Sequence, residues 1–147
     1  MALLNNDTVT ANDASFEGGG IETDGPATGD FTSMSNTILA LNLAPDAADC
    51  AGNSGNSPSA GFNLFGDTTG CALALMSSDI VGADPMFDTN LKDNGGATLT
   101  LAILAGSPAQ DAGNPAADDG VGNHCTAQDQ RGNSRVGRCD IGAYEFP

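Results

Sequence analysis

Two segments of the chain share nearly the same pattern, and this repeat is the feature that most constrains the fold. Asn6–Asn12 reads NDTVTAN, and Asn36–Asn42 reads NTILALN. A weaker copy, GFNLFGD, spans Gly61–Asp67, with Asn63 in the place of Asn36, and a further apolar stretch, DIVGADPMF, spans Asp79–Phe87. Each is a short run of apolar or β-branched residues between turn-forming Asn, Asp or Gly, which is typical of short strands. Such strands at a period of about 20 to 30 residues indicate a repeat architecture.

The repeat predicts an all-β fold of stacked β-coils, a β-solenoid, in which each strand pairs with its equivalent at about 4.8 Å. Asn side chains at equivalent turns would stack and satisfy turn amides; an ordinary β-sandwich is the alternative. Loops are expected between the strands, at Glu17–Asp30 and Ala51–Gly61.

The second half has a different character, with one predicted strand at Ala97–Leu104, Gly- and Pro-rich loops, and a last short strand at Asp140–Phe146. We therefore expect β-helix coils over residues 1–90 and a C-terminal cap over residues 91–147 of the same domain, because the last coil of such a stack needs covering.

Composition favours β-structure with many turns and excludes two classes of partner. Of the 19 acidic residues 16 are Asp, and there is one Lys, so the residues that build long surface helices are scarce. A net charge of −15 with four Lys and Arg argues against binding to nucleic acid or to anionic membranes. The chain has no run of 18 apolar residues, so we expect no membrane insertion.

The start of the chain, MALLNNDTVT, lacks the basic and long apolar segments of a signal peptide and reads as strand. We therefore interpret the coils as N-terminally truncated, with the natural chain continuing upstream. An open first coil presents unpaired backbone N–H and C=O groups. This predicts self-association through Leu3–Asn12.

Four cysteines form an even set, which is typical of a disulfide framework and of an oxidising, extracellular compartment. Three pairings are possible, and the spacing favours Cys50 with Cys71 and Cys125 with Cys139. Stacking Cys50 and Cys71 on adjacent coils would bring them within disulfide range. A zinc site that uses His124 and Cys125 is the weaker alternative, because no CxxC or HxxxH pair accompanies them.

Three of the four Lys and Arg residues lie close together near the C-terminus, at Arg131, Arg135 and Arg138. An Arg side chain presents five N–H donors and can hold a carboxylate and backbone carbonyls together. We predict that Arg131 and Arg135 are structural clamps that join the DQRG loop to the last predicted strand and to the loop at Asp111, and that Arg138 is exposed. The acidic residues expected in these clamps are Asp111, Asp140 and Glu145. A basic patch for an acidic ligand is the alternative.

Several segments resemble a known family: NTILALN, GSPAQDAG and DQRG with the following CDIGAYEF. They are similar to the C-terminal region of bacterial surface proteins of the choice-of-anchor Q type, which have polymorphic outer-membrane-protein-like repeats. Gln110 stands where the family motif usually has Ile. The resemblance implies a right-handed parallel β-helix that is secreted or displayed on the cell surface, at the end that usually precedes an anchor. It implies no defined biochemical role.

Catalysis within this segment is not expected. With 19 acidic residues some carboxylate pair is always available, so a pair alone indicates nothing, and a chain without Trp and with one Tyr lacks the aromatic platforms of sugar sites. Ser107 lies outside a G-x-S-x-G motif. Calcium is a further candidate cofactor, with possible ligands at Asp118, Asp119 and Asn123 around flexible Gly and with a solvated acidic turn as the alternative.

The sequence therefore predicts a non-catalytic structural or interaction module at the C-terminal end of an extracellular bacterial β-solenoid. Its role would be that of a stalk, an adhesin or an assembly unit. The alternative is the non-catalytic tail of a carbohydrate-active β-helix enzyme, a polysaccharide lyase or hydrolase. The sequence does not identify a surface glycan or protein ligand.

Overall fold

The computed structural model describes residues 2–23, 32–52, 57–116 and 122–147. Within these residues the regular secondary structure consists of short strands, with no helix. The strands are β1 (Ala2–Asn5), β2 (Thr8–Val9), β3 (Ile21–Thr23), β4 (Thr32–Ser35), β5 (Ile38–Leu39), β6 (Cys50–Gly52), β7 (Ser57–Pro58), β8 (Leu64–Phe65), β9 (Leu73–Ala74) and β10 (Ile80–Val81).

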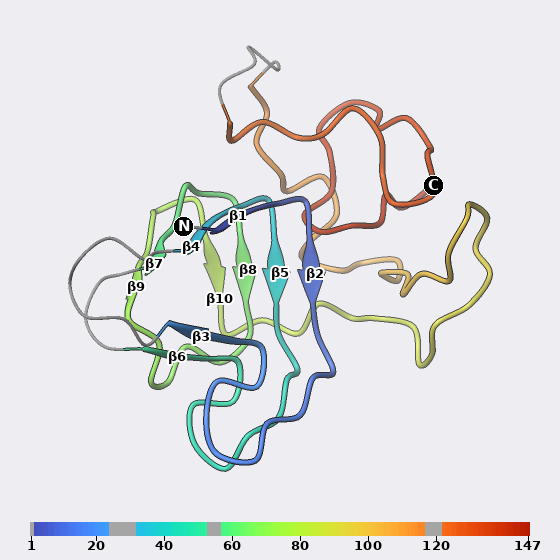
Figure 1. Ribbon diagram of the computed structural model, residues 1–147. Coiled ribbons are helices and arrows are strands. Elements are labelled where there is room, and N and C mark those ends of the chain that lie inside the picture. Colours follow the sequence, from blue (N-terminus) through green and yellow to red (C-terminus); the bar gives the residue numbers. More distant parts are fainter. Residues whose placement is uncertain (1, 24–31, 53–56, 117–121) are drawn as a thin grey trace.

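The strands pair in parallel and gather in four small sheets (Figure 1). The largest has the spatial order β10-β8-β5-β2, and the pairs β1-β4, β3-β6 and β7-β9 form one sheet each. In the largest sheet Thr8 pairs with Ile38, Ile38 with Leu64, and Leu64 with Ile80. The chain therefore returns to this sheet after successively shorter stretches of sequence.

The predicted right-handed parallel β-helix, or β-solenoid, is wrong for this structure. The described strands are short and are divided among four separate small sheets instead of the continuous faces that regular coils would give. Because the return distance shortens at every step from Thr8 to Ile80, each pass of the chain has a different length. After Val81 the described residues form no further strand, and their only ladder contacts are isolated antiparallel bridges.

The largest sheet is buried on both faces, and this explains why its strands come from continuous apolar runs. On one face Leu39 and Phe65 pack with Met34 and Cys50 in a core cluster, and all four are at most 4 % exposed. On the other face Ile38 and Leu64 pack against the C-terminal part of the chain through Ala102, Ile103, Ala109, Ile141 and Tyr144. The C-terminal region thus lies along a face of the sheet.

Polar side chains just before strands β5, β8 and β10 form a row of hydrogen bonds that links each strand of the largest sheet to the next. The Asp7 N–H donates to Thr37 Oγ1 (3.4 Å), the Thr37 N–H to Asn63 Oδ1 (3.0 Å), and the Asn63 N–H to Asp79 Oδ1 (3.0 Å). Asn63 is therefore equivalent to Thr37, and not to Asn36 as the sequence suggested.

The expected stacking of Asn side chains occurs at the other end of the strands. The Asn12 N–H and Nδ2 both donate to Asn42 Oδ1, at 3.1 and 2.9 Å. Asn42 in turn donates through its N–H and Nδ2 to Asp49 Oδ1, at 2.8 and 2.9 Å. The side chains of Asn42 and Asp49 thus accept turn N–H groups that the short strands leave without ladder partners.

Two strands expected from the sequence are absent from the described structure. Within Ala97–Leu104 only Thr100 and Ile103 form bridges, to Lys92 and Phe87, and both bridges are antiparallel. Asp140–Phe146 adopts no strand, because its backbone groups bond to side chains and to non-adjacent turns instead of to a neighbouring strand. Conversely, β3, β6 and β7 extend into segments that the sequence suggested were loops.

None of the described residues belongs to a helix that is long and apolar enough to cross a membrane.

Candidate functional site

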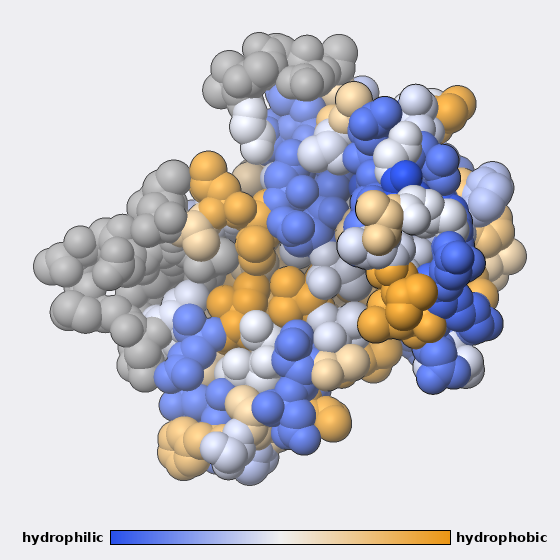
Figure 2. All heavy atoms as spheres, turned by 45° about the vertical axis from the view of Figure 1, so that its right-hand side comes forward, coloured by the Kyte–Doolittle hydropathy of each residue, from blue (hydrophilic) through white to orange (hydrophobic). Residues whose placement is uncertain are grey.

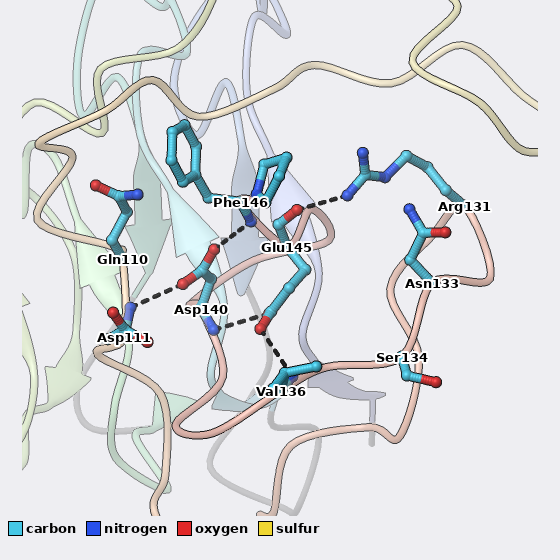
Figure 3. A pocket seen from close by; sticks show the side chains of 10 residues that line it. Gln110, Asp111, Arg131, Asn133, Ser134, Val136, Asp140, Glu145 and Phe146 are labelled. Atoms are coloured by element: carbon cyan, nitrogen blue, oxygen red, sulfur yellow. Dashed lines mark hydrogen bonds between the residues drawn. The ribbon is translucent and has the colours of Figure 1, made fainter.

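The hollow around the C-terminal arginines gathers most of the residues predicted to act together. Its volume is about 610 Å³, and its lining includes Asp111, Arg131, Asp140 and Glu145 (Figure 3). The elements that form it are the DQRG loop, the segment 133–136, the loop at Asp111 and the last residues of the chain. Charged side chains from separate segments thus meet in one place, each held by its own set of bonds.

Asp129 organises the DQRG loop and is the key acidic residue that the sequence analysis left out of the clamp. Its Oδ1 accepts the N–H groups of Arg131 (2.9 Å) and Asn133 (3.0 Å), which is the local turn geometry that Asp favours. Its Oδ2 accepts Arg131 Nε (2.7 Å) and the Glu145 N–H (3.2 Å). The signal for this role was present in the sequence as an Asp shortly before a Gly in a turn.

Arg131 acts as the predicted clamp between the DQRG loop and the end of the chain. Besides Asp129, its guanidinium donates to the Glu145 carbonyl oxygen and lies 3.8 Å from the centroid of the Tyr144 ring. The Arg131 side chain is only 7 % exposed. A desolvated Arg over an aromatic face is a favourable cation–π geometry, so this contact adds to the ion pair.

Arg135 holds the turn at 140–142 against Glu145. Its Nη1 donates to Glu145 Oε2 (2.8 Å) and, more weakly, to the Asp140 carbonyl oxygen (3.3 Å), and its Nη2 donates to the Gly142 carbonyl oxygen (2.7 Å). The Arg135 and Glu145 side chains are 4 % and 11 % exposed. This fork therefore satisfies carbonyls in a segment that has no ladder partner.

Asp140, in the last segment of the chain, bonds the loop at Asp111, which Arg131 and Arg135 were expected to bond. Its Oδ1 accepts the Asp111 N–H (2.7 Å) and its Oδ2 accepts the Phe146 N–H (2.5 Å), as Figure 3 shows. Asp111 therefore takes part through its backbone N–H, although the residue as a whole is exposed. The expectation that Arg131 and Arg135 bond the Asp111 loop directly is not met, because neither guanidinium donates to it in the contacts described above.

Arg138 makes the connection to that loop instead. It is exposed, as predicted, yet its Nε donates to the Gly113 carbonyl oxygen (2.8 Å) and its Nη2 to the Ala112 carbonyl oxygen (3.0 Å). Its guanidinium also lies 5.8 Å from the Phe62 ring centroid. All three arginines therefore bond backbone carbonyls, which is the role expected of clamps and not of a basic patch open to a ligand.

Burial and hydrogen bonding move the pKa values of Asp129 and Asp140 in opposite directions. Burial acts to raise the pKa of Asp129, but hydrogen bonds from Arg131 and from three backbone N–H groups outweigh it and lower the pKa below 3.8. For Asp140 burial prevails and raises the pKa above 3.8, and the nearby negative charges of Glu145 and Asp111 raise it further. The hydrogen bonds from the Phe146 and Asp111 N–H groups lower the pKa, but by less.

Every carboxylate oxygen at the centre of the cluster already accepts a hydrogen bond from the protein. This holds for both oxygens of Asp129 and of Asp140, and for Glu145, whose Oε1 accepts the Val136 N–H (3.3 Å) while its Oε2 also accepts the Asp140 N–H (3.0 Å). General acid–base chemistry needs a carboxyl group within reach of a substrate proton. These three groups are directed at the backbone instead.

The structure pairs Cys50 with Cys71 and Cys125 with Cys139, the pairing that the spacing favoured, with Cα–Cα distances of 5.0 and 6.3 Å. The second disulfide packs directly on the Asp111 loop: a Cβ atom on Gly113 would lie 2.2 Å from Cys139 Sγ, so only Gly fits there. Two disulfides are consistent with an extracellular protein.

The calcium candidates are only partly described. Asp118 and Asp119 lie outside the described residues. The Asn123 carbonyl oxygen accepts Nδ2 of Asn36 and of Asn114, both at 3.0 Å, and its own Nδ2 donates to the Ala60 carbonyl oxygen (3.4 Å). Among the residues that the structure describes, no three His, Cys, Asp or Glu side chains are grouped so that they could hold a metal ion.

Comparison of the chain with protein-family models, with curated proteins and with solved structures finds no match. The function is therefore argued from the site and the fold alone.

Proposed function

We propose that this chain is a non-catalytic structural and interaction module of an extracellular bacterial protein. The observation that carries the proposal is that every carboxylate oxygen of Asp129, Asp140 and Glu145 accepts a hydrogen bond from within the protein. A catalytic carboxylate pair keeps at least one oxygen directed at the substrate.

Two further observations support an extracellular structural role. Two disulfides, which persist in oxidising compartments, connect Cys50 with Cys71 and Cys125 with Cys139. A net charge of −15 gives repulsion from nucleic acid and from anionic lipid. The bacterial origin rests on the resemblance to choice-of-anchor Q surface proteins alone, and a stalk, an adhesin and an assembly unit all fall within this proposal.

Open strand edges support a role in assembly. Among the residues that the structure describes, β1, β2 and β3 each pair with one other strand, which leaves one edge of each without a strand partner. Leu3, at 67 % exposed, lies on β1 within the segment Leu3–Asn12 for which self-association is predicted. Open edges pair readily with further strands.

The proposal is tested by assaying turnover against acidic and neutral polysaccharides, with new reducing ends and absorbance of unsaturated products as the readouts. We expect no turnover from the wild type at high protein concentration. Turnover that Glu145→Gln abolishes, while circular dichroism shows the variant folded, would overturn the proposal and assign catalysis to the cluster. Sedimentation velocity over a range of concentrations tests assembly separately.

A further inference from the structure

A second hollow runs between the open edge of β2 and the segment 84–101. Its volume is about 770 Å³. Its lining comes from the strand side (Thr8, Thr10, Ala11 and Leu41), from the segment 84–101 (Asp84, residues 86–91, Leu99 and Leu101) and from the C-terminal region (Gln130 and Ala143). In Figure 1 the segment 84–101 leaves the base of the sheet and extends beyond β2, the strand at the edge of the sheet. We call this hollow the edge groove.

Two residues in the edge groove have backbone conformations that their side chains disfavour. Leu41 has φ 61° and Met86 has φ 54°, in the left-handed region. This region costs a residue with a Cβ atom about 1–2 kcal/mol, and Asn or Gly accepts it far more readily. Leu41 is 53 % exposed and Met86 is 39 % exposed, so burial within the protein compensates little of that cost.

Among the other non-glycine residues with positive φ that the structure describes, Asn6, Asn36 and Asp111 are of the type that tolerates this region. Ala11 and Ala47 meet the same Cβ penalty as Leu41 and Met86, but their side chains present little apolar surface. Phe62 is the only other large one, and it is half-buried beside the Arg138 guanidinium. The two large, exposed side chains in strained positions thus both lie in the edge groove, which is where strain marks function.

The edge groove also offers backbone groups and negative charge. The carbonyls of Asp7 and Val9 accept the N–H groups of Ile38 and Ala40, so the N–H and C=O of Thr8 point away from β5 to the open edge. Asp84 and Asp88 line the groove, and Asp88 is already paired with Lys92, whose Nζ lies 2.7 Å from Asp88 Oδ2. On the side of the molecule that Figure 2 shows, clusters of hydrophobic surface lie beside hydrophilic surface.

We propose that the edge groove binds an extended peptide segment with apolar and cationic side chains, which adds a strand to the open edge of β2. Strand addition supplies main-chain hydrogen bonds. Because successive side chains of a strand point to opposite faces, every second side chain of the peptide would contact the apolar surface at Leu41 and Met86. The carboxylate of Asp84, which stands outside the Asp88–Lys92 ion pair, and the net charge of −15 favour cationic residues in the partner. This inference rests on the proposal that the chain is an interaction module.

The test uses the whole chain and a short fluorescein-labelled peptide of alternating valine and lysine, with binding followed by fluorescence anisotropy. Leu41→Asn and Met86→Asn each weaken binding by about tenfold or more, because each removes apolar contact from the groove. Both variants melt at the same temperature as the wild type or higher, since Asn suits a positive φ better than Leu or Met. This combination separates a binding role from a structural one.

Leu43→Asn is the matched control, because Leu43 is 61 % exposed, has no positive φ and does not line the edge groove. It leaves binding unchanged. A peptide with glutamate in place of lysine binds more weakly, and a peptide with proline in place of valine, which removes N–H donors, does not bind. Equal binding by Leu41→Asn, Leu43→Asn and the wild type would overturn the proposal.

Two other results would also overturn it, and they differ from a failure of the module proposal. If no peptide binds but Leu41→Asn abolishes a dimer seen by sedimentation, the groove holds a second copy of this chain. If nothing binds and no dimer forms, the edge groove inference fails while the absence of turnover still supports the module. Turnover of a polysaccharide contradicts the module itself.

Discussion

The stacked strands of residues 2–82 and the C-terminal region of residues 97–147 are held together by different interactions. In the first, parallel pairs join β2, β5, β8 and β10, and the side chains between them form an apolar core. In the second, side chains of Asp129, Arg135 and Asp140 bond the backbone of nearby turns, beside a few backbone–backbone bonds. A ladder repeats one bond type along the chain, whereas each side-chain bond of the C-terminal region depends on one particular residue.

This difference has a consequence for tolerance to substitution. The surface of a paired strand accepts many residue types, because the ladder uses only backbone groups. In the C-terminal region a lost side chain leaves buried backbone carbonyls without donors, at about 1–3 kcal/mol each. The two regions share one apolar layer, in which Ile38 and Leu64 meet Ile141 and Tyr144, so damage to that layer affects both.

The largest expected effect comes from the core of the stacked strands. Phe65 is 1 % exposed and packs with Leu39, Met34 and Cys50, so Phe65→Ala should cost about 3–5 kcal/mol of the free energy of unfolding. Urea denaturation followed by circular dichroism measures it. Phe16→Ala is the control, because Phe16 is 69 % exposed. Similar costs at the two sites would contradict the assignment of the core.

The two disulfides are expected to come next, and they separate the two regions. Removing either one, as Cys50→Ala with Cys71→Ala or as Cys125→Ala with Cys139→Ala, should cost about 3 kcal/mol in the chain-entropy model. Only the second pair should also release the Gly113 amide, which donates to the Cys139 carbonyl oxygen at 2.9 Å. Hydrogen exchange at the Gly113 amide should therefore be faster in the Cys125→Ala, Cys139→Ala variant and unchanged in the Cys50→Ala, Cys71→Ala variant.

Non-reducing peptide mapping provides the control for both disulfide variants. It should recover the peptide pairs 50–71 and 125–139 from the wild type. Free thiols or crossed pairs would refute the framework before any stability is compared.

The arginine clamps give the third effect. Arg131→Lys and Arg135→Lys keep the charge but lose the planar fork, and each should lower stability by about 1–3 kcal/mol, because buried carbonyls at Glu145 or Gly142 lose a donor. Arg138→Lys should cost less, since Arg138 is exposed and water can replace its exposed bond to the Ala112 carbonyl oxygen. Thermal unfolding of the three variants side by side is the measurement. If all three variants melted at the wild-type temperature, the clamp hypothesis would be wrong and the basic-patch alternative would be favoured.

The sequence was informative where one residue type decides the local structure. The apolar pairs Ile38–Leu39 and Leu64–Phe65 follow from the repeat, because a strand buried on both faces must be continuously apolar. Arg135 was predicted as a clamp because a loop-rich segment needs donors for its carbonyls. The first conclusion needs only the local pattern of apolar residues, and the second needs only a count of carbonyls that lack hydrogen-bond donors.

The sequence could not supply the parts that depend on long-range geometry. Regular coils were expected, but the step from Leu64 to its partner Ile80 is much shorter than the step from Thr8 to Ile38, and no local pattern sets that distance. Asp140–Phe146 was expected to be a strand, yet its backbone bonds to the side chains of Arg135, Glu145 and Asp140 itself. The edge groove was also missed, because the strain at Leu41 appears only in backbone angles.

The smallest effect is a pH dependence that separates two acidic residues of the C-terminal region. The pKa of Asp129 lies below the ordinary 3.8, so its contribution to stability is present above that value and is lost as the pH falls through the folded pKa. The pKa of Asp140 lies above 3.8, so the folded state holds its proton more tightly, and stability falls as the pH rises through the raised pKa. The two contributions therefore oppose each other across the acid range.

Urea midpoints measured from neutral pH down to pH 3 test this opposition. Asp129→Asn should lower stability at neutral pH and flatten the loss on acidification, because the ionised form that Arg131 stabilises is gone. Asp140→Asn should remove the opposing rise instead, so that its acid loss is steeper than that of the wild type. Asp13→Asn, at an exposed position among the stacked strands, is the control and should follow the wild-type curve. If Asp129→Asn and Asp140→Asn changed the profile in the same direction, the two carboxylates would not differ in environment, and the view of the C-terminal region as a set of individually specified bonds would be wrong.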